Sequence, residues 1–434
     1  MQEALAMVSP STVATIENQP RMGCASADAP SHAPRSQPWG IPRLVIASTG
    51  MVRHPPIVGG AVEAYVDDIS SMFANGQGYS VTVVSDYRQH SLPPPGVDTV
   101  DVHSPIDRFP LRPIAGALGH VVAGSFMAAA VNRYVRSLRI AREQIVLHLN
   151  EEVSAEILTR LLPRIPKVFT LHNPPPGLSV MSSTKSDRTL RQLNFRLLLR
   201  FALPRMEGVI ALSSRIREYL CSDWNLDPSR VHVLPLSVDT ENFRPPPSGA
   251  NECGNPIILF VGRLDHRKNV VALVDALPHL RYGTRLRLVG DGPLSEELRL
   301  QVCRLGLENR IEFIRNASPV DLMNLYRTSS IFVLPSLLEA YPRVVVEAAS
   351  SGLPVVLPRL PIYRDFIEGG FVETCGPSGS REELAAAVNR LVDSPDRRKE
   401  LGRRAREFAI LHNSFDAIST GLARIYRQVV ECGS

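Results

Sequence analysis

A segment in the second half of the sequence carries two carboxylates among apolar residues. It reads Glu339-Ala-Tyr-Pro-Arg-Val-Val-Val-Glu347, and Gly352 and Pro354 follow it. Proline is favoured at a helix start and glycine followed by proline at its end, so the segment predicts a loop carrying Glu339 and a short helix carrying Glu347. Carboxylates in this setting can accept hydrogen bonds from the vicinal hydroxyls of a sugar or a ribose. The apolar neighbours of Glu347 predict that its charge has a partner.

Two cations follow an apolar run earlier in this half. The run 257–261 is a predicted strand, and Gly262-Arg263-Leu-Asp-His-Arg-Lys268 comes directly after it. Arg263 and Lys268 in such a place can neutralise the charge of a departing diphosphate without a metal. Taken alone, the segment is also compatible with a solvated basic helix start.

Glycine pairs follow two further predicted strands. Gly59-Gly60 comes after the first strand of the chain, and Gly290-Asp-Gly292-Pro lies in the second half. Glycines there let backbone N–H groups approach an anion at a helix N-terminus. Each pair alone is also typical of an ordinary turn.

Short β-branched runs alternate with longer helical patterns from Leu44 onward. This alternation indicates parallel α/β units, in which ligands bind outside the carboxyl ends of the strands. The alternation restarts at Ile257, so the sequence predicts an α/β fold of two Rossmann-like, doubly wound domains. The predicted strands are residues 44–48, 80–85, 145–149, 167–171, 208–212, 231–234, 257–261, 285–289, 311–314, 331–334 and 355–357.

The same pattern predicts the domain organisation. Residues 1–40 are rich in Ala, Ser and Pro and predict a flexible tail, and residues 41–243 form the first domain. Residues 244–256 are turn-rich without periodicity, which predicts a linker. Residues 257–410 form the second domain. The helical pattern of 411–434 predicts a C-terminal helix able to cross back to the first domain.

Composition limits the classes of function. A chain of 434 residues suits two domains, and a formal charge of +5 is only mildly basic, so we expect no dedicated nucleic-acid surface. The six cysteines form no C-x-x-C pair and the N-terminus lacks a signal-peptide pattern, which favours a cytoplasmic protein. The most apolar window, 114–131, is interrupted by glycines and His120, which favours a buried or interfacial helix over a membrane span.

Taken together, these segments resemble glycosyltransferase family 4. The segment from Glu339 to Glu347 is similar to the family's Glu-x-x-x-x-x-x-x-Glu motif, and further matches occur in the family's order from Leu44 to the C-terminus. They are Gly59-Gly60, Thr170-Leu-His172, Ala211-Leu-Ser213-Ser214, Val238-Asp239-x-x-x-Phe243, Gly262-Arg263 through Lys268, and Gly290-Asp-Gly-Pro293. No single motif is specific, but their combination is.

The resemblance implies a GT-B architecture, in which two Rossmann-like domains face each other across a cleft. It also implies a retaining, metal-independent transfer of a hexose-type sugar from a UDP- or GDP-sugar to a hydroxyl acceptor, with no cofactor. Arg263 and Lys268 match the cations that hold the donor diphosphate, Glu347 the carboxylate that binds the ribose, and Glu339 the one that contacts the donor sugar. His172 matches the histidine near the reaction centre.

The implied catalytic residues are His172, Arg263, Lys268 and Glu339. The implied donor-binding residues are Gly59, Gly60, Gly262, Arg263, Lys268, Glu339, Ala340, Tyr341 and Glu347. Gly59 and Gly60 match the loop that closes over the donor phosphates, and no metal ligand is expected.

The sequence departs from the family pattern at two places. Leu236-Ser237-Val238-Asp239 stands where members often have Asn-Gly-Val-Asp, and Ala340-Tyr341-Pro342 where Gly-Phe-Gly is common. Pro342 removes a backbone donor that a glycine would offer.

The first domain, which would bind the acceptor, says less about its ligand. The stretch from Arg188 to Arg205 places arginines among Leu and Phe residues, a basic amphipathic pattern that favours contact with anionic lipid and a lipid-linked acceptor. The alternative is a surface helix whose apolar side packs on its own domain. Peripheral association with the cytoplasmic membrane face is therefore one hypothesis.

Three other classes of function compete. A GT-B module without turnover would only bind a sugar nucleotide, and the full set of matched site residues argues against it. A nicotinamide-dependent oxidoreductase requires Gly-x-Gly-x-x-Gly after a first strand, which neither Gly59-Gly60 nor Gly262 supplies. An epimerase or phosphorylase of the same fold would act without an added acceptor.

Overall fold

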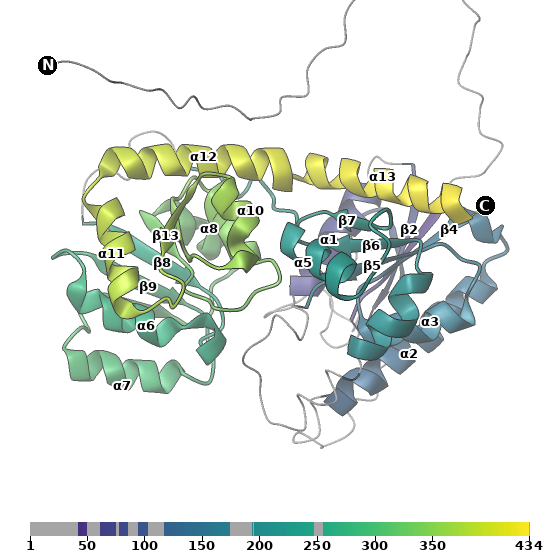
Figure 1. Cartoon of the computed structure of the whole chain (residues 1–434), viewed down its shortest axis with the longest axis horizontal. Helices are drawn as coiled ribbons and strands as arrows, with labels where there is room; N and C mark the ends of the chain where they lie inside the picture. The colour runs from purple at the N-terminus through teal and green to yellow at the C-terminus, as the bar shows by residue number, and fades with distance from the viewer. Residues whose placement is uncertain are drawn as a thin grey trace, which may run out of the picture. The chain divides into compact units, whose positions relative to one another are not determined.

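The computed structural model describes residues 42–49, 61–74, 78–85, 94–102, 117–173, 193, 195–246 and 255–433, all within one compact unit, Gly40–Ser434. Two parallel β-sheets organise these residues (Figure 1). The strand order is β3-β2-β1-β4-β5-β6-β7 in the first sheet, called sheet A, and β10-β9-β8-β11-β12-β13 in the second, called sheet B. The predicted α/β fold of two Rossmann-like domains is confirmed.

Sheet A precedes sheet B along the chain. The strands of sheet A are β1 (Arg43–Ala47), β2 (Ser80–Ser85), β3 (Val97–Asp101), β4 (Ile145–Leu149), β5 (Lys167–Leu171), β6 (Gly208–Ala211) and β7 (Val231–Val233). Those of sheet B are β8 (Ile257–Val261), β9 (Arg285–Val289), β10 (Ile311–Ile314), β11 (Ile331–Val333), β12 (Val355–Pro358) and β13 (Val372–Cys375).

Two strands, β3 and β13, were not predicted from the sequence, and each lies at an edge of its sheet. In β3, three of the five side chains are exposed and two of those are aspartates, so the strand contains no apolar run. An edge strand needs burial on fewer sides than a central strand, which weakens its sequence signal. The central strands, buried almost throughout, are the ones that the apolar runs predicted.

Helices connect the strands and cover the sheets. The α-helices are α1 (Ala61–Ala74), α2 (Ala117–Ser137), α3 (Glu152–Leu161), α5 (Ser214–Glu218), α6 (Val270–Ala276), α7 (Ser295–Leu305), α8 (Pro319–Arg327), α9 (Arg343–Ser350), α10 (Arg364–Glu368), α11 (Arg381–Val392), α12 (Pro395–Asn413) and α13 (Phe415–Gly433). The single-turn helices used below are η4 (Leu198–Ala202), η5 (Leu203–Arg205) and η7 (His266–Lys268).

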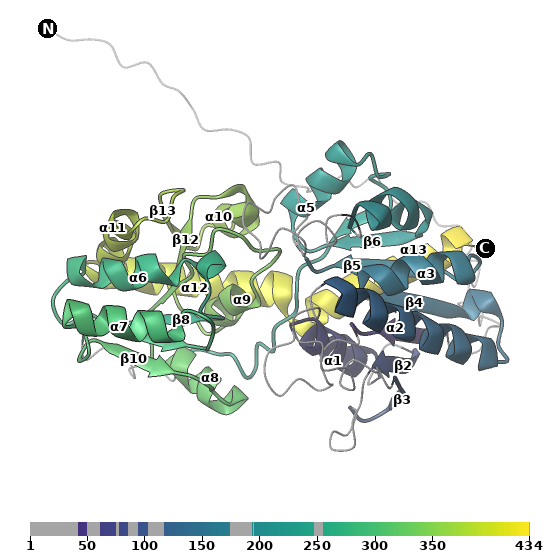
Figure 2. The ribbon, with the colours of Figure 1, turned by 90° about the horizontal axis from the view of Figure 1, so that it is seen from below.

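Helix α2 contains most of the apolar window that raised the question of a membrane span. It packs against α3 (Figure 2), and its residues Met127, Ala128 and Val131 are buried in the core. Among the described helices, none combines the length and the apolar character that crossing a membrane requires.

The C-terminal helical stretch is two helices rather than one. Helix α12 packs on α9 and sheet B, and α13 packs on α1 and sheet A (Figure 1). The chain is extended at Ser414, and the buried Asn413 side chain donates to the Leu236 carbonyl and the Tyr341 hydroxyl at 2.7 and 2.9 Å. The Asn413 backbone carbonyl accepts from the Val238 N–H at 2.8 Å, in place of the helical hydrogen bond that it would accept in a continuous helix.

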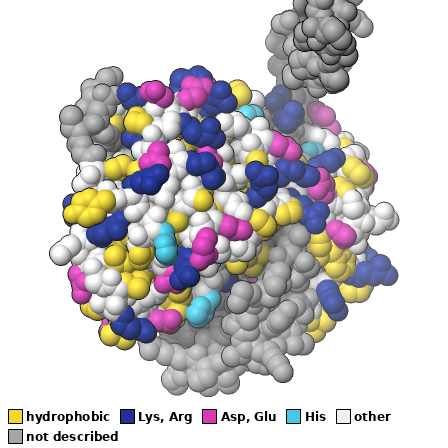
Figure 3. All heavy atoms as spheres, turned by 60° about the vertical axis from the view of Figure 1, so that its left-hand side comes forward, with side chains coloured by type: hydrophobic (Ala, Val, Ile, Leu, Met, Phe, Trp, Pro, Cys, Tyr) yellow, Lys and Arg dark blue, Asp and Glu magenta, His cyan; other side chains and the backbone are white. Residues whose placement is uncertain are grey.

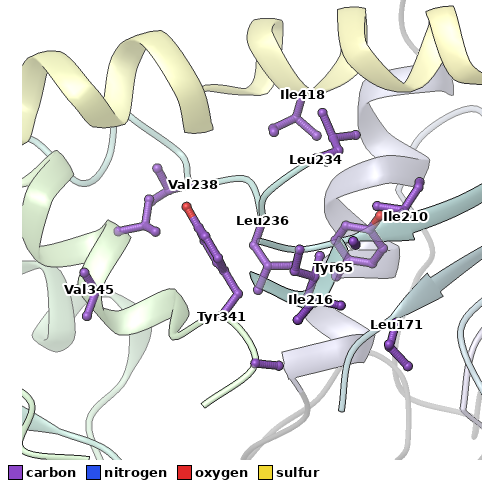
Figure 4. Close-up of a cluster of buried hydrophobic side chains, with 14 of the residues drawn as sticks. Tyr65, Leu171, Ile210, Ile216, Leu234, Leu236, Val238, Tyr341, Val345 and Ile418 are labelled. Carbon is purple, nitrogen blue, oxygen red and sulfur yellow. The ribbon is translucent and has the colours of Figure 1, made fainter. Parts of the chain in front are cut away.

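A single apolar core runs through the unit. Figure 4 shows a part of it in which Tyr65 and Leu171 from sheet A and its helices lie near Tyr341 and Val345 from the sheet B half, with Leu236 between them. All five side chains are buried. Burial of this kind, at about 25 cal/mol per Å² of apolar area, is the main favourable term that holds the two halves in one unit.

Tyr426 ties α13 to sheet A through a buried hydrogen-bond chain. Its hydroxyl lies 2.6 Å from His148 Nδ1, and His148 Nε2 lies 2.7 Å from the Thr170 hydroxyl. Burial lowers the pKa of His148 to about 3, so the ring is neutral at pH 7 and offers one donor and one acceptor. Both hydroxyls can take either role, and the chain is therefore satisfied.

Replacing Tyr426 by Phe should destabilise the protein, because it leaves the buried His148 Nδ1 without a partner. We expect the free energy of unfolding, measured by urea denaturation, to fall by about 1–3 kcal/mol. Tyr282, which is fully exposed, provides the matched control, and Tyr282→Phe should leave stability unchanged. Equal stability of the two variants would contradict the role given to the Tyr426 hydroxyl.

Candidate functional site

The carboxyl edge of sheet B brings together loops that are distant in sequence. Strands β8 and β11 are neighbours, although β9 and β10 separate them along the chain. The strand order reverses between them, and ligands of doubly wound sheets bind at such a switch point. The loop with Gly262, Arg263 and Lys268 leaves β8, and the loop with Glu339 leaves β11. These predicted site residues therefore lie at one edge of one sheet.

The two glycine turns of this edge contact each other through their backbones. A Cβ on Gly290, whose φ is 133°, would lie 2.1 Å from the Gly262 carbonyl oxygen. Only glycine fits such a position without moving the backbone. The Gly262 N–H donates to the Val289 carbonyl at 2.9 Å, which fixes the loop after β8 against the end of β9.

Lys268 and Glu339 form an ion pair. The Lys268 Nζ donates to Glu339 Oε1, and the side chains are only 17% and 14% exposed. Lys268 ends η7, and the Asp265 carboxylate caps that turn by accepting from the backbone N–H groups of Arg267 and Lys268 at 3.1 and 3.3 Å. A cation and a carboxylate are thus held together at the switch point in a partly desolvated place, where electrostatic interactions are strong.

Arg263 takes a different position from Lys268. Its side chain is 65% exposed, and its Nε lies 3.7 Å from the Asp265 carboxylate. An exposed pair of this length contributes little to stability. The guanidinium is therefore free to bind an anion without breaking a strong contact.

Glu347 has the partners that its apolar surroundings required. It lies on α9, is buried, and accepts from the Tyr326 hydroxyl at 2.9 Å. Arg343, one turn earlier on the same helix, places its Nε 3.4 Å from the other carboxylate oxygen. Burial raises the pKa of Glu347, while Arg343 and Tyr326 act in the opposite direction. The carboxylate still has lone pairs for a ligand, since it can accept about four hydrogen bonds.

The side chains of Ala340 and Tyr341 are buried in the core. The Tyr341 hydroxyl accepts from Asn413, and its ring packs on Phe366 with the centroids 4.9 Å apart. Figure 4 shows Tyr341 among other buried apolar side chains. Any part that Ala340 and Tyr341 take in donor binding would therefore come from their backbone groups.

His172 stands at the carboxyl end of β5 in sheet A, next to the strand-order reversal between β1 and β4. Its Nε2 lies 2.9 Å from Asn150 Oδ1, while Asn150 Nδ2 donates to the Ala47 carbonyl at 3.0 Å. Burial lowers the pKa of His172 to about 3, so the ring is neutral at pH 7. Because the amide oxygen of Asn150 accepts, the proton lies on Nε2, and Nδ1 keeps its lone pair.

Two predicted residues, Gly59 and Gly60, lie outside the described residues. Helix α1 begins at Ala61, directly after them. Its residue Glu63 is buried and accepts a hydrogen bond from the Thr49 hydroxyl, which follows β1.

Within the described ranges, no group of three or more His, Cys, Asp and Glu side chains is placed to hold a metal ion.

Sequence reasoning missed several polar residues that support the site. Asn150 orients His172, Tyr326 donates to Glu347, and Arg343 contacts both Glu347 and Asp68 of α1. Asn150 had a signal, because a polar residue directly after a buried strand commonly faces the ligand edge. Tyr326, Arg343 and Asp68 are helix residues. Arg343 and Glu347 are one turn apart, but the contacts of Tyr326 with Glu347 and of Arg343 with Asp68 join distant segments, and no local pattern marks them.

Two known protein families match this chain. Residues 58–242 match the family described as Glycosyltransferase Family 4, and residues 246–408 match Glycosyl transferases group 1. The chain belongs to the glycosyltransferases of group 1 and family 4. The two matches meet at the predicted linker. The first covers β2 to β7 of sheet A, and the second covers all strands of sheet B.

One curated relative and several solved structures are similar to this chain over most of its length. The α-D-kanosaminyltransferase of Streptomyces kanamyceticus is 26% identical over 74% of this chain and 88% of its own length. Sucrose-phosphate synthase from Thermosynechococcus elongatus has a TM-score of 0.71 at 20% identity, covering 90% of this chain and 100% of that chain. HepE from Anabaena, in complex with UDP and glucose, has a TM-score of 0.65 at 20% identity, covering 88% and 98%. The matches to three other curated relatives are shorter, and they cover 60%, 35% and 65% of those proteins' own lengths.

The neutral, partly buried His172 predicts that the free energy of unfolding decreases in acid. In the folded state it binds a proton only near its pKa of about 3, whereas in the unfolded state it does so below its ordinary value of 6.5. The free energy of unfolding should therefore fall as pH drops between these values, by about 1 kcal/mol per pH unit for this group. His172→Gln should make the slope shallower by that amount, while the contribution of His148, whose pKa is also about 3, should remain; urea denaturation from about pH 6 to 4 measures both. Parallel pH profiles of the variant and the wild type would contradict it.

Proposed function

We propose that this glycosyltransferase moves a hexose-type sugar from a UDP- or GDP-sugar to a hydroxyl acceptor, with retention of configuration and without a metal or other cofactor. The Lys268–Glu339 ion pair at the switch point of sheet B carries the proposal. It places a cation for a diphosphate next to a carboxylate for sugar hydroxyls. The UDP bound to the structural neighbour HepE supports a nucleoside diphosphate donor.

Charge development explains why these residues suit the reaction. When the nucleoside diphosphate leaves, negative charge grows on its β-phosphate, and a cation already held in place stabilises that charge more in the transition state than in the ground state. In the proposal Lys268 and the exposed Arg263 take that role. Glu339 orients Lys268 and accepts from the donor sugar, Glu347 accepts from the ribose, and Gly262 and the Ala340-Tyr341 backbone line the phosphate and sugar positions.

His172 takes a place at the reaction centre in this proposal. Its neutral ring and fixed Nε2 proton leave Nδ1 as a hydrogen-bond acceptor, which suits a sugar hydroxyl. Gly59 and Gly60 complete the proposed site as the loop that approaches the donor phosphates. The alternative is a GT-B module that binds a sugar nucleotide without turnover, and only a measurement of transfer or donor hydrolysis separates the two.

Donor hydrolysis provides the first test. With EDTA present, the wild type should bind and slowly hydrolyse one member of a panel of UDP-, GDP- and ADP-sugars, and binding should raise its melting temperature. Lys268→Met should lower the hydrolysis rate on the order of a hundredfold, the loss typical of one preorganised electrostatic group.

The control for this test is Arg381→Met, which breaks an exposed ion pair with Glu382 in the same half. It should leave hydrolysis unchanged. A donor that binds but is never turned over would favour the binding module, and a strict requirement for a divalent metal would overturn the metal-independent mechanism.

The acceptor side supports a second, separate proposal, that of peripheral contact with an anionic membrane at the cytoplasmic face and a lipid-linked acceptor. Residues 188–192 and 194 of the predicted basic segment lie outside the described residues. In the part that is described, Arg196, Arg200 and Arg205 are exposed, as is the apolar Phe201. Phe195, Leu198 and Leu203 are buried, so most of the apolar side packs on its own domain.

Acidic and basic side chains are more evenly mixed on another face of the molecule. On the face seen in Figure 3, basic and acidic side chains are interspersed. Ion pairs such as Arg281–Asp393, at 2.7 Å, occur in the sheet B half. Such a surface gives little net attraction to anionic lipid or nucleic acid. The proposed membrane contact therefore depends on the segment of η4 and η5.

Vesicle co-sedimentation tests this contact. The wild type should bind vesicles that contain anionic lipid and not neutral ones. Arg196→Glu with Arg200→Glu should weaken binding by about thirtyfold or more, since each basic residue near the surface contributes about 1 kcal/mol. The charge-matched control, Arg381→Glu with Arg403→Glu, should bind as the wild type does. Binding that ignores lipid charge would exclude the proposal.

A further inference from the structure

An arginine shared between two carboxylates connects the two halves of the unit. Arg343, the first residue of α9, places its NH1 2.9 Å from Asp68 Oδ2, and its Nε 3.4 Å from Glu347 Oε1. Asp68 belongs to α1, which covers sheet A, whereas α9 follows β11 of sheet B. All three side chains are mostly buried, with exposed fractions of 18% for Arg343, 15% for Asp68 and 10% for Glu347.

The two contacts of Arg343 are unequal. The Asp68 contact is a short ion pair, in which NH1 makes no well-aligned hydrogen bond, and the Glu347 contact is a longer and therefore weaker ion pair. Asp68 is itself fixed by the Ser237 hydroxyl, which donates to the same oxygen at 2.8 Å. Asp68 is therefore a rigid competitor for the guanidinium.

The competition determines what Glu347 can bind. An arginine and a carboxylate one helical turn apart can form a close pair with two parallel hydrogen bonds, which would occupy both carboxylate oxygens. With NH1 drawn to Asp68, the closest approach of Arg343 to Glu347 is through Nε, and Tyr326 occupies one further lone pair. Lone pairs remain on Glu347 for two neighbouring hydroxyls.

We infer that Asp68 is a positioning residue for the donor: it draws the Arg343 guanidinium away from Glu347 and so keeps that carboxylate open to the ribose hydroxyls of a nucleoside diphosphate sugar. This inference rests on the proposed function, in which Glu347 accepts from the ribose. It adds a residue of the sheet A half, with no contact of its own to the ribose, to the recognition of the donor.

Ribose discrimination gives a direct measurement. Isothermal titration compares UDP, GDP and ADP with their 2′-deoxy forms, at about pH 8 so that the raised pKa of Glu347 does not decide the result. The wild type should bind the ribonucleotide on the order of ten- to a hundredfold more tightly than its 2′-deoxy form, the loss expected for one hydrogen bond to a charged group. Asp68→Asn should reduce that ratio to within about threefold of one, because Arg343 then closes on Glu347.

Removing the arginine tests the mechanism. In the double variant with Asp68→Asn and Arg343→Met, nothing competes for Glu347, and the ratio should return toward that of the wild type. This rescue is non-additive, and loss of structure at α1 would not produce it. Asp98→Asn is the matched control in the same half, since Asp98 pairs with Arg43 at 3.1 Å away from the site, and it should keep the wild-type ratio. Melting temperatures confirm that each variant is folded.

The outcomes separate this inference from the function on which it rests. If the wild type binds no nucleoside diphosphate, the proposed function fails and the inference fails with it. If it binds one but tolerates the 2′-deoxy form, donor binding stands and the role of Glu347 with Asp68 is overturned. If it discriminates and Asp68→Asn discriminates equally, or the double variant shows no recovery, the inference alone is overturned.

Discussion

The order of parallel strands is the constraint on which the rest of this structure depends. In each sheet the order reverses once, between β1 and β4 in sheet A and between β8 and β11 in sheet B. At a reversal the following loops leave in opposite directions, which leaves room for a ligand between them. The loops that carry Asn150 and His172 follow β4 and β5, beside one reversal. The loops that carry Lys268 and Glu339 follow β8 and β11, at the other reversal.

Buried charge is the second organising factor. Lys268 with Glu339, and Arg343 between Asp68 and Glu347, are ionised groups in partly or mostly buried places. A buried charge without a partner would destabilise the folded protein, and each of these charges has a partner of opposite sign. Such pairs add little net stability compared with apolar residues, so their presence at the ligand edge of sheet B is better explained by binding than by folding.

The C-terminal helices connect the halves by other means. Asn413 interrupts the helical stretch and bonds to Leu236 and Tyr341, and Tyr426 reaches the buried His148 under sheet A. Together with the apolar core shown in Figure 4, these contacts hold the segment after Val233 and the loop after β11 in one arrangement. Asp68 and Arg343 can meet only because that arrangement is set.

Local sequence determined the elements that local physics controls. Apolar runs of the right length marked the buried central strands, Gly262 and Gly290 marked turns, and the segment from Glu339 to Glu347 marked a loop followed by a short helix. The resemblance to glycosyltransferase family 4 came from the order of such segments. The edge strands β3 and β13 escaped detection, because polar residues interrupt both and neither contains an apolar run.

Only the tertiary structure decided which of these residues meet. The pairing of Lys268 with Glu339, the hydrogen bond from His172 to Asn150 and the sharing of Arg343 between Asp68 and Glu347 join residues that are far apart in sequence. Periodicity and turn residues specify the type of each element but not its neighbour in a sheet. The strand order and the approach of Asp68 on α1 to Arg343 on α9 set those neighbours, and with them the electrostatics of the site.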